Sequence, residues 1–224
     1  MATSVKNYKV AYGPRVDLEK LDNLYSPQTV KPFTPPPPGI DNLGIVSKDT
    51  FYVPGKGEYD VEFKGYVRVA RSKPSTDQWV DSEVYTNLIE MCMRGDSAEL
   101  GPITVTLDPE TLSTGQLRTP QADLHCDQPD KACRMAVAAH FDLPKLGLTL
   151  FNKEPIELTI DNVKAIPPAG APGNGQIYHV LPLYNLADPD GNPAAYLTRL
   201  KFAMGTYITE AEIQGISRGE LIPN

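Results

Sequence analysis

The sequence has few of the residues that disulfide frameworks, metal centres and nucleic-acid surfaces need. It contains three cysteines and three histidines among 224 residues. Three cysteines are too few, and odd in number, for a disulfide framework, so we interpret them as reduced thiols. The net charge is −7 and no cluster of Lys and Arg occurs. Binding to nucleic acid is therefore not expected, because phosphate recognition needs clustered basic side chains.

Long apolar runs are also missing. No uninterrupted apolar stretch reaches the ~18 residues that a membrane-spanning helix needs, so no membrane association is expected. The first residues lack the apolar region of a secretory signal, which makes a cytoplasmic location the expectation. The sequence has no G-x-S-x-G elbow, P-loop, G-x-G-x-x-G loop or H-x-H pair. These absences predict no cofactor and leave no recognisable catalytic constellation.

Proline, by contrast, is abundant. The chain holds 22 prolines, about twice the usual share. Seven of them lie in residues 1–40, including the run Pro35–Pro38. Because proline fixes φ and removes a backbone donor, this run predicts a short, stiff polyproline II segment. Residues 1–40 are therefore interpreted as an extended Pro-rich arm, whereas most other prolines mark the ends of predicted strands.

The arm differs from the rest of the chain in charge. Residues 1–31 hold five basic and three acidic side chains, a balance of +2, whereas the remaining residues have a balance of −9. A cationic segment attached to an anionic body is attracted to that body or to a neighbouring subunit. The sequence therefore predicts a homo-oligomer formed through the arm.

From about residue 50 the apolar residues follow a period of two, which is typical of antiparallel strands with one wet face. The clearest alternation runs through residues 59–69, and shorter ones occupy 103–107 and 156–160. Two further alternating segments, 177–183 and 196–202, flank a turn with Asp and Gly at turn positions and predict a hairpin.

Two segments fit both helix and strand. Residues 79–93 show both periods, and a strand from Val84 is favoured because it would form a hairpin with residues 103–107. Residues 133–141 alternate, but their alanines favour a helix, and the pattern does not decide between the two. Near the end of the chain, Thr209 and Glu212 have the spacing of a capping box, which predicts a short helix.

These elements predict a mainly β protein, either an antiparallel β-sandwich or an open β-barrel, with a Pro-rich N-terminal arm and a short C-terminal helix. The predicted division is an arm over residues 1–40, one all-β domain over 41–207, and a helix and tail over 208–224.

Two titratable residues occur in predicted apolar surroundings. His179 shares the face of apolar neighbours in its strand, and Glu90 interrupts a mostly apolar run. A histidine or carboxylate inside an apolar interior has a perturbed pKa and can act as a general acid or base. Three tyrosines in or next to the two strands of the predicted hairpin would give such an interior polar contacts to a ligand: Tyr178, Tyr184 and Tyr196.

A second group of residues has the chemistry of metal ligands but not the spacing. His125, Cys126, Cys133 and His140 lie within sixteen residues. Structural zinc sites bring their ligands in close pairs, and adjacent side chains on an extended segment point apart. No metal site is therefore predicted.

Two functions are consistent with this pattern. The first is a soluble, non-enzymatic β-domain protein that binds a ligand, such as a small apolar molecule, or that assembles with itself or other proteins. The second is a metal-independent β-barrel enzyme of the isomerase or cyclase type, in which His179 or Glu90 acts as acid or base on a small apolar substrate.

Overall fold

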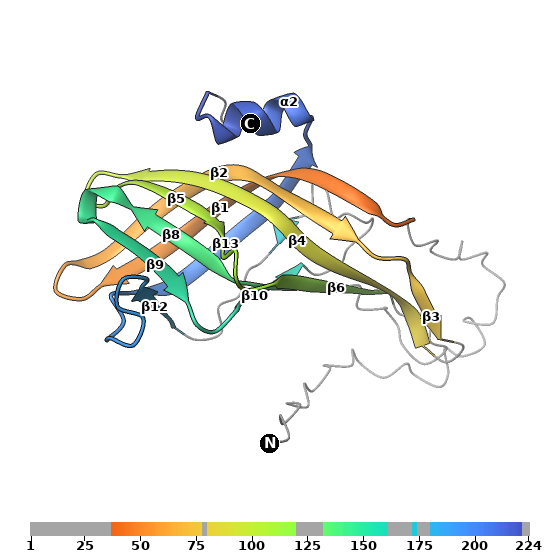
Figure 1. Cartoon of the computed structure of the whole chain (residues 1–224), viewed down its shortest axis with the longest axis horizontal. Coiled ribbons are helices and arrows are strands. Elements are labelled where there is room, and N and C mark those ends of the chain that lie inside the picture. Colours follow the sequence, from red (N-terminus) through yellow and green to blue (C-terminus); the bar gives the residue numbers. More distant parts are fainter. Residues whose placement is uncertain (1–36, 78–79, 120–131, 161–171, 174–179, 221–224) are drawn as a thin grey trace, which may run out of the picture.

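A computed structural model describes residues 37–77, 80–119, 132–160, 172–173 and 180–220 of the chain. Most of the described residues belong to one large antiparallel sheet, which curves round into a barrel, and the described part of the chain has one α-helix, which lies outside the sheet (Figure 1). The prediction of a mainly β protein with a short C-terminal helix is confirmed.

Four long strands form the continuous part of the sheet. In sheet order they are β4 (Val80–Ser97), β2 (Gly57–Arg71), β1 (Gly39–Val53) and β13 (Ala195–Tyr207). Strands β1 and β2 form a hairpin whose tight turn has two glycines with positive φ, Gly55 at 75° and Gly57 at 116°. Side chains other than glycine rarely adopt this conformation, which explains where the hairpin turns.

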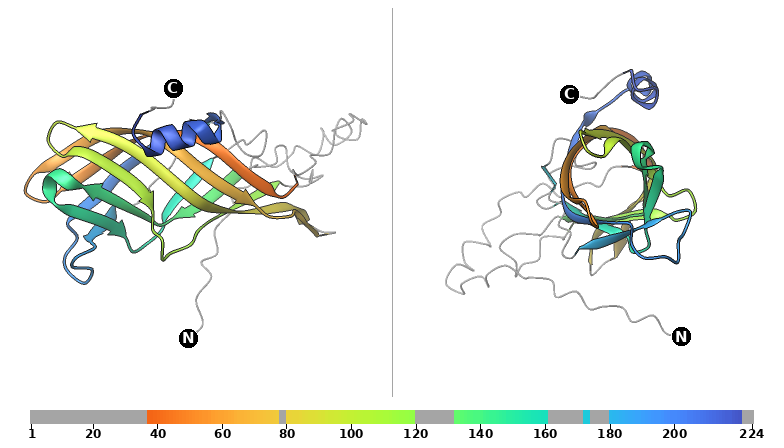
Figure 2. Two further views of the ribbon diagram at one scale, coloured as in Figure 1. Left: turned by 45° about the horizontal axis from the view of Figure 1, so that its top comes forward. Right: turned by 90° about the vertical axis from the view of Figure 1, so that its left-hand side faces the viewer.

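At one end, shorter strands close the sheet on itself. From β13 the pairing continues through β12 (Leu181–Asn185), β9 (Leu148–Asn152), β8 (Ala139–Leu143) and β5 (Gly101–Leu107). Strand β5 then pairs with the second half of β4, so eight of the described strands form a closed ring. The end-on view in Figure 2 shows this ring. The sequence predicts a sandwich or an open barrel; the structure has a barrel, and the pairing of β4 with β5 closes it.

At the other end, different short strands continue the sheet. They are β6 (Ser113–Thr119), β7 (Ala132–Val137) and β10 (Ile156–Ile160), which extend from the first half of β4, with β3 (Ser75–Asp77) beside β4 and β11 (Pro172–Gly173) beside β13. A short 3-10 helix, η2 (Pro144–Leu146), joins β8 to β9. Strand β4 changes partner from β6 to β5 near a β-bulge at Ile89, where its pairing with β2 skips one residue.

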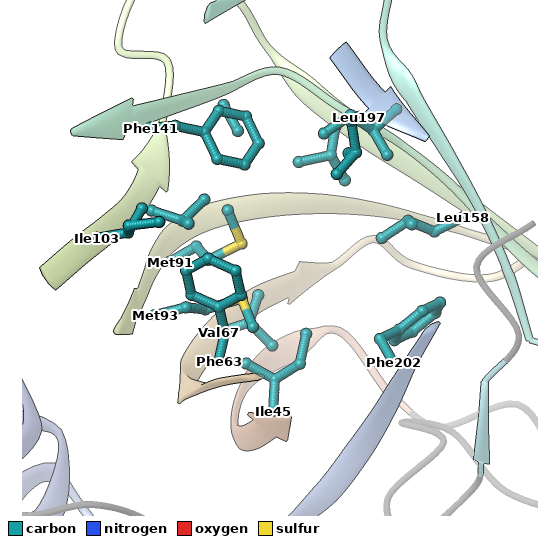
Figure 3. Close-up of a cluster of buried hydrophobic side chains, with 14 of the residues drawn as sticks. Ile45, Phe63, Val67, Met91, Met93, Ile103, Phe141, Leu158, Leu197 and Phe202 are labelled. Carbon is teal, nitrogen blue, oxygen red and sulfur yellow. The ribbon is translucent and has the colours of Figure 1, made fainter. Parts of the chain in front are cut away.

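The inner wall of the barrel is apolar. Alternate residues of the strands whose side chains the structure describes point inward, and the apolar ones form one continuous cluster of buried side chains. Figure 3 shows part of this cluster, in which Met91 and Met93 of β4 lie near Phe63 and Val67 of β2. A barrel of about eight strands has an interior that side chains can fill or that can hold one small ligand. The inner wall is therefore the part of the fold that could receive a ligand.

The helix α2 (Glu210–Ser217) lies on the outer face of the barrel (Figures 1 and 2). Thr209 is its N-cap and forms the predicted capping box with Glu212. Two isoleucines of the helix, Ile213 and Ile216, are buried against Tyr66 of β2 in a small cluster that is separate from the barrel interior. The helix therefore covers the outward-facing side chain of Tyr66.

The structure also decides the two ambiguous segments. Residues 80–97 are strand β4, as favoured, and β4 pairs with β5 in the expected hairpin. Residues 133–141 form parts of two strands, β7 and β8, and no helix. The predicted hairpin across residues 187–193 is confirmed by the pairing of β12 with β13, and Gly191 donates to the carbonyl of Asp188 in its turn at 3.2 Å. The division into arm, domain and tail stays a prediction.

Candidate functional site

An acidic side chain, Asp49 on β1, lies in an apolar part of the inner wall. It alternates in phase with the inward-facing Ile45 and Phe51, and only 4% of it is exposed. Its register partners on the neighbouring strands are apolar, Val61 on β2 and Leu200 on β13. The sheet register therefore places the carboxyl group of Asp49 inside the barrel.

Burial dominates the electrostatics of Asp49. It raises the pKa of the carboxyl group from its ordinary value of 3.8 to about 7, and a hydrogen bond with the Ser47 side chain opposes the rise. Among the residues that the structure describes, the Oδ1 atom of Asp49 has no hydrogen-bond partner. A buried polar atom without a partner costs about 1–3 kcal/mol, so this oxygen atom has an unused capacity to bind a donor.

Thr86 on β4 is the second inward-facing residue of this kind. It is 5% exposed, and its Oγ1 atom likewise has no partner among the described residues. Its register partners are Arg71 on β2 and Gly115 on β6. A Cβ atom on Gly115 would lie 2.4 Å from the Thr86 hydroxyl oxygen, so a larger residue there would collide with it. Thr86 lies toward the end of the barrel opposite to that of Asp49.

Near Thr86, the inner wall also holds an ion pair. The Arg71 Nε atom donates to Asp41, and the Arg71 Nη2 atom donates to the other carboxylate oxygen at 3.2 Å. The Arg71 Nη1 atom donates to the carbonyl of Pro37 at 2.7 Å. The side chains of Arg71 and Asp41 are 11% and 5% exposed. This pair fixes the start of β1 against the end of β2.

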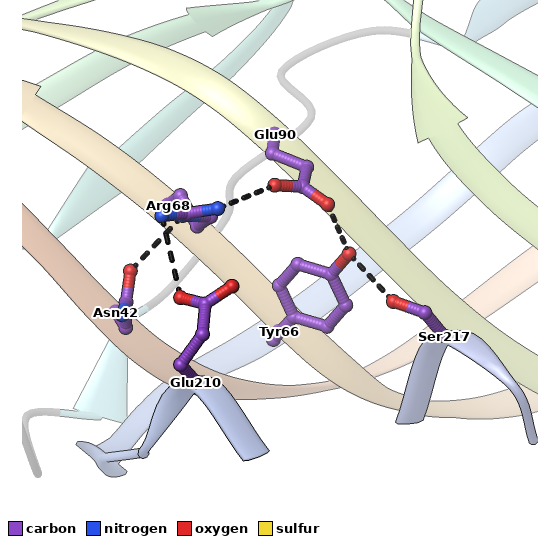
Figure 4. A network of polar contacts seen from close by, with 6 residues as sticks. All are labelled: Asn42, Tyr66, Arg68, Glu90, Glu210 and Ser217. Atoms are coloured by element: carbon purple, nitrogen blue, oxygen red, sulfur yellow. Dashed lines mark hydrogen bonds and ion pairs between the residues drawn. The ribbon is translucent and has the colours of Figure 1, made fainter. Parts of the chain in front are cut away.

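Glu90, a predicted acid or base, lies on the outer face of the barrel and not in the interior. It accepts a hydrogen bond from the Tyr66 hydroxyl, and its other oxygen lies 3.1 Å from Arg68 (Figure 4). The network continues to helix α2, since Arg68 pairs with Glu210 at 3.4 Å and the Tyr66 and Ser217 hydroxyls lie 2.9 Å apart. Burial and then the bond with Glu90 raise the pKa of Tyr66 to about 12. This network attaches the helix to the sheet.

The predicted tyrosine contacts also face outward where they are described. The ring of Tyr184 on β12 is tilted by 46° relative to that of Phe151, with 6.1 Å between the ring centroids, and the Nζ atom of Lys153 lies 4.1 Å from the centroid of the Tyr184 ring. Tyr196 on β13 lies 6.0 Å from the ring of Tyr52. The structure therefore does not bring these two tyrosines together with Glu90. His179 and Tyr178 lie outside the described residues, so their assignments stay predictions.

No group of three or more His, Cys, Asp or Glu side chains within the described ranges could hold a metal ion. Of the four residues with metal-ligand chemistry, His125 and Cys126 lie outside these ranges. Cys133 is buried on β7, and burial raises the pKa of its thiol to about 12. His140 on β8 lies 3.6 Å from Asp108.

Comparison with known proteins relates the chain to one protein family and to one solved structure. Residues 1–214 match the model of a family of unknown function, DUF6073. The chain belongs to this family. Its fold is similar to the solved structure of DynF from the dynemicin biosynthesis pathway of Micromonospora chersina, with 53% sequence identity, a TM-score of 0.73 and coverage of 94% of each chain. No curated protein matches the chain.

In this member of DUF6073, the structure adds one site residue, Asp49, to those predicted from the sequence. Asp49 is not among those predicted residues, although the sequence contains a signal for it. It is in phase with the alternating apolar residues Leu43, Ile45, Phe51 and Val53, and so occupies a position where an apolar residue is expected.

In the part of the chain that is described, no helix has the length and hydropathy to cross a bilayer.

Proposed function

We propose that this protein binds a small, apolar molecule inside its barrel and that it does so, without catalysis, in a small-molecule biosynthesis pathway. The observation that supports binding is the Oδ1 atom of Asp49, a buried, inward-facing oxygen atom that has no partner among the described residues and lies in a wall of apolar side chains. The Oγ1 atom of Thr86, toward the opposite end of the barrel, is a second such atom and is too far along the sheet to contact the same small ligand. The pathway role rests on similarity to DynF, a protein from the dynemicin biosynthesis pathway.

The energetics favour an interior ligand. Buried polar atoms in proteins almost always have a partner, and those that lack one in a protein alone are commonly satisfied by water or a ligand. The apolar wall would contribute about 25 cal/mol for each Å² of apolar ligand surface that leaves water. A few polar contacts in a mostly apolar lining are typical of small-molecule sites.

A second role, self-assembly through the Pro-rich arm, is supported by charge. Residues 1–31 carry a balance of +2 and the rest of the chain carries −9. The outer face of the described barrel includes acidic side chains that are exposed, such as Glu58 and Glu62. A cationic arm of one subunit would be attracted to such a face of another.

The enzymatic alternative needs an acid or base in the interior. Glu90 lies outside the barrel in a structural network, so the geometry does not favour it for this role. His179 stays a prediction for that function. The proposal of a binding protein therefore has more support from the described contacts.

Binding is tested with Nile red, an apolar dye whose fluorescence rises when it leaves water. We expect the wild-type protein to bind the dye with saturation, and we expect Val67→Phe to reduce binding at least threefold, because Val67 is fully buried in the inner wall. Val46→Phe is the matched control, since Val46 lies on the opposite face of the same sheet. If Val67→Phe does not fold, Leu197→Phe replaces it.

Two results would contradict the proposal. One is the absence of saturable dye binding by the wild-type protein. The other is an equal loss of binding in the inward and outward variants, which would place the dye elsewhere. Extraction of the purified protein with organic solvent, followed by mass spectrometry, checks independently whether an apolar molecule accompanies it.

A further inference from the structure

We infer that Asp49 is the hydrogen-bond anchor of the interior site and that the ligand is a neutral, apolar molecule with a phenolic hydroxyl group. This inference rests on the proposed function, because it assumes that a ligand enters the barrel. It adds the chemical class of the ligand and the residue that would recognise it.

The register of β1 places the carboxyl group of Asp49 on the inward-facing side of the sheet, so a ligand would reach it from the interior. Across the sheet its neighbours are Val61 and Leu200, and along β1 its same-face neighbours are Ser47 and Phe51. Of these four side chains, only Ser47 is polar. The Oδ1 atom has no partner among the described residues, so a ligand group that donates a hydrogen bond would complete its contacts.

The charge of the surroundings selects a neutral donor. The contributions to the pKa of Asp49 are burial and the Ser47 side chain, and no basic side chain of the described residues contributes. A cationic ligand would leave an ion pair in an apolar interior, where the loss of hydration offsets most of the attraction. A hydroxyl group can donate to Oδ1 without bringing a charge into the barrel.

The wall beside Asp49 favours an aromatic carrier for that hydroxyl group. Phe51, two residues further along β1, makes edge-to-face contacts with Phe63 and Phe141, at centroid distances of 6.2 and 5.7 Å. Figure 3 shows Phe63 and Phe141 among the buried side chains of the interior. Aromatic rings gain additional attraction from such edge and face contacts, so a phenol fits both the polar atom and the wall.

The test compares two probes that differ in one donor, 2-naphthol and 2-methoxynaphthalene. Dissociation constants are measured by fluorescence for the wild-type protein and for Asp49→Leu, Asp49→Asn and the exposed control Asp96→Asn. We expect the wild-type protein and the control to prefer 2-naphthol by about tenfold, as one good hydrogen bond would give. We expect Asp49→Leu to abolish this preference and Asp49→Asn, which keeps a carbonyl acceptor, to retain most of it.

The outcomes separate this inference from the proposed function. If the wild-type protein binds both probes equally, or if Asp49→Leu keeps the preference for 2-naphthol, the anchor role of Asp49 is wrong while interior binding stands. If no variant binds either probe and Nile red also fails to bind, the proposed function itself is wrong. Removal of a buried carboxyl group is not expected to unfold the barrel, so Asp49→Leu can be measured directly.

Discussion

Arg71 and Asp41 form a buried ion pair that joins the last residue of β2 to the start of β1 inside the barrel. Both carboxylate oxygens of Asp41 accept hydrogen bonds from the guanidinium group. Two charges held in this way are stabilising only as a pair, because either one alone would be left buried without compensation.

The pair predicts a large effect for one substitution and a small effect for two. We expect Arg71→Met to lower the free energy of unfolding by about 3–5 kcal/mol, because it leaves the Asp41 carboxylate unpaired. We expect the double variant Arg71→Met with Asp41→Leu to recover most of this loss. Urea unfolding followed by circular dichroism measures both values.

The exposed pair of Arg218 and Glu220 is the control. Both side chains are 58% exposed, and Arg218→Met is expected to change stability by less than about 1 kcal/mol. A loss in Arg71→Met that is as small as this control would show that the interior pair is solvated.

The contact of Tyr66 with Glu90 and Ser217 predicts how helix α2 is held. Tyr66→Phe keeps the apolar contacts with Ile213 and Ile216 but removes the hydroxyl group between the sheet and the helix. We expect a loss of about 1 kcal/mol and faster amide hydrogen exchange in residues 210–217, with little change in the barrel strands. Hydrogen exchange measured by mass spectrometry locates the effect.

Tyr59→Phe is the matched control for this substitution. The Tyr59 hydroxyl donates to the carbonyl of Lys56 in an exposed turn, at 2.9 Å. The substitution Tyr59→Phe should leave amide hydrogen exchange in helix α2 unchanged. If the amides of helix α2 exchange equally fast in Tyr66→Phe and Tyr59→Phe, the Tyr66 hydroxyl does not attach the helix to the sheet.

Much of the sheet could be predicted from the sequence because alternation is a local property. The strand over residues 59–69, the hairpin of β12 with β13 and the capping box at Thr209 all follow from side-chain types a few positions apart. Residues 133–141 show the limit of this reasoning. Their alanines favour a helix locally, but pairing with β6, β10, β5 and β9 satisfies the backbone as strands.

The candidate site was harder to predict because a face depends on register. Glu90 follows a β-bulge at Ile89, and the skipped residue shifts the alternation so that Glu90 faces outward beside Arg68. Asp49 is the opposite case, since its phase along β1 is regular but its polarity suggests an exposed position. Which face of a strand becomes the interior is decided by pairing between segments far apart in the sequence.

Self-assembly through the Pro-rich arm predicts a change in mass when the arm is removed. Deletion of residues 1–34 leaves Pro37, whose carbonyl accepts the Arg71 bond, in place. We expect light scattering to give a multiple of 24.5 kDa for the full chain and a single subunit for the shortened chain.

Because the attraction is between opposite charges, salt at about 0.5 M should dissociate the full-length assembly. An identical subunit number for the two chains at low salt would exclude this role for the arm. The barrel of the shortened chain is checked by its thermal unfolding.

The raised pKa of Asp49 predicts a specific dependence of stability on pH. The folded protein binds a proton at Asp49 up to a pKa of about 7, whereas the unfolded chain releases it near 3.8. The contribution of this carboxyl group to stability is therefore complete below about pH 4 and is lost as the pH rises to 7. By linkage, the loss amounts to about 4 kcal/mol above pH 7.

Asp49→Asn removes this titration while keeping the shape of the side chain. We expect the variant and the wild-type protein to have similar stability at pH 4, and the variant to become progressively more stable than the wild type up to about pH 7, with a constant difference above it. The exposed control Asp96→Asn should follow the wild type throughout. Urea unfolding at several pH values measures the difference. A constant difference between Asp49→Asn and the wild type from pH 4 to pH 8 would show that Asp49 ionises normally and does not lie in an apolar interior.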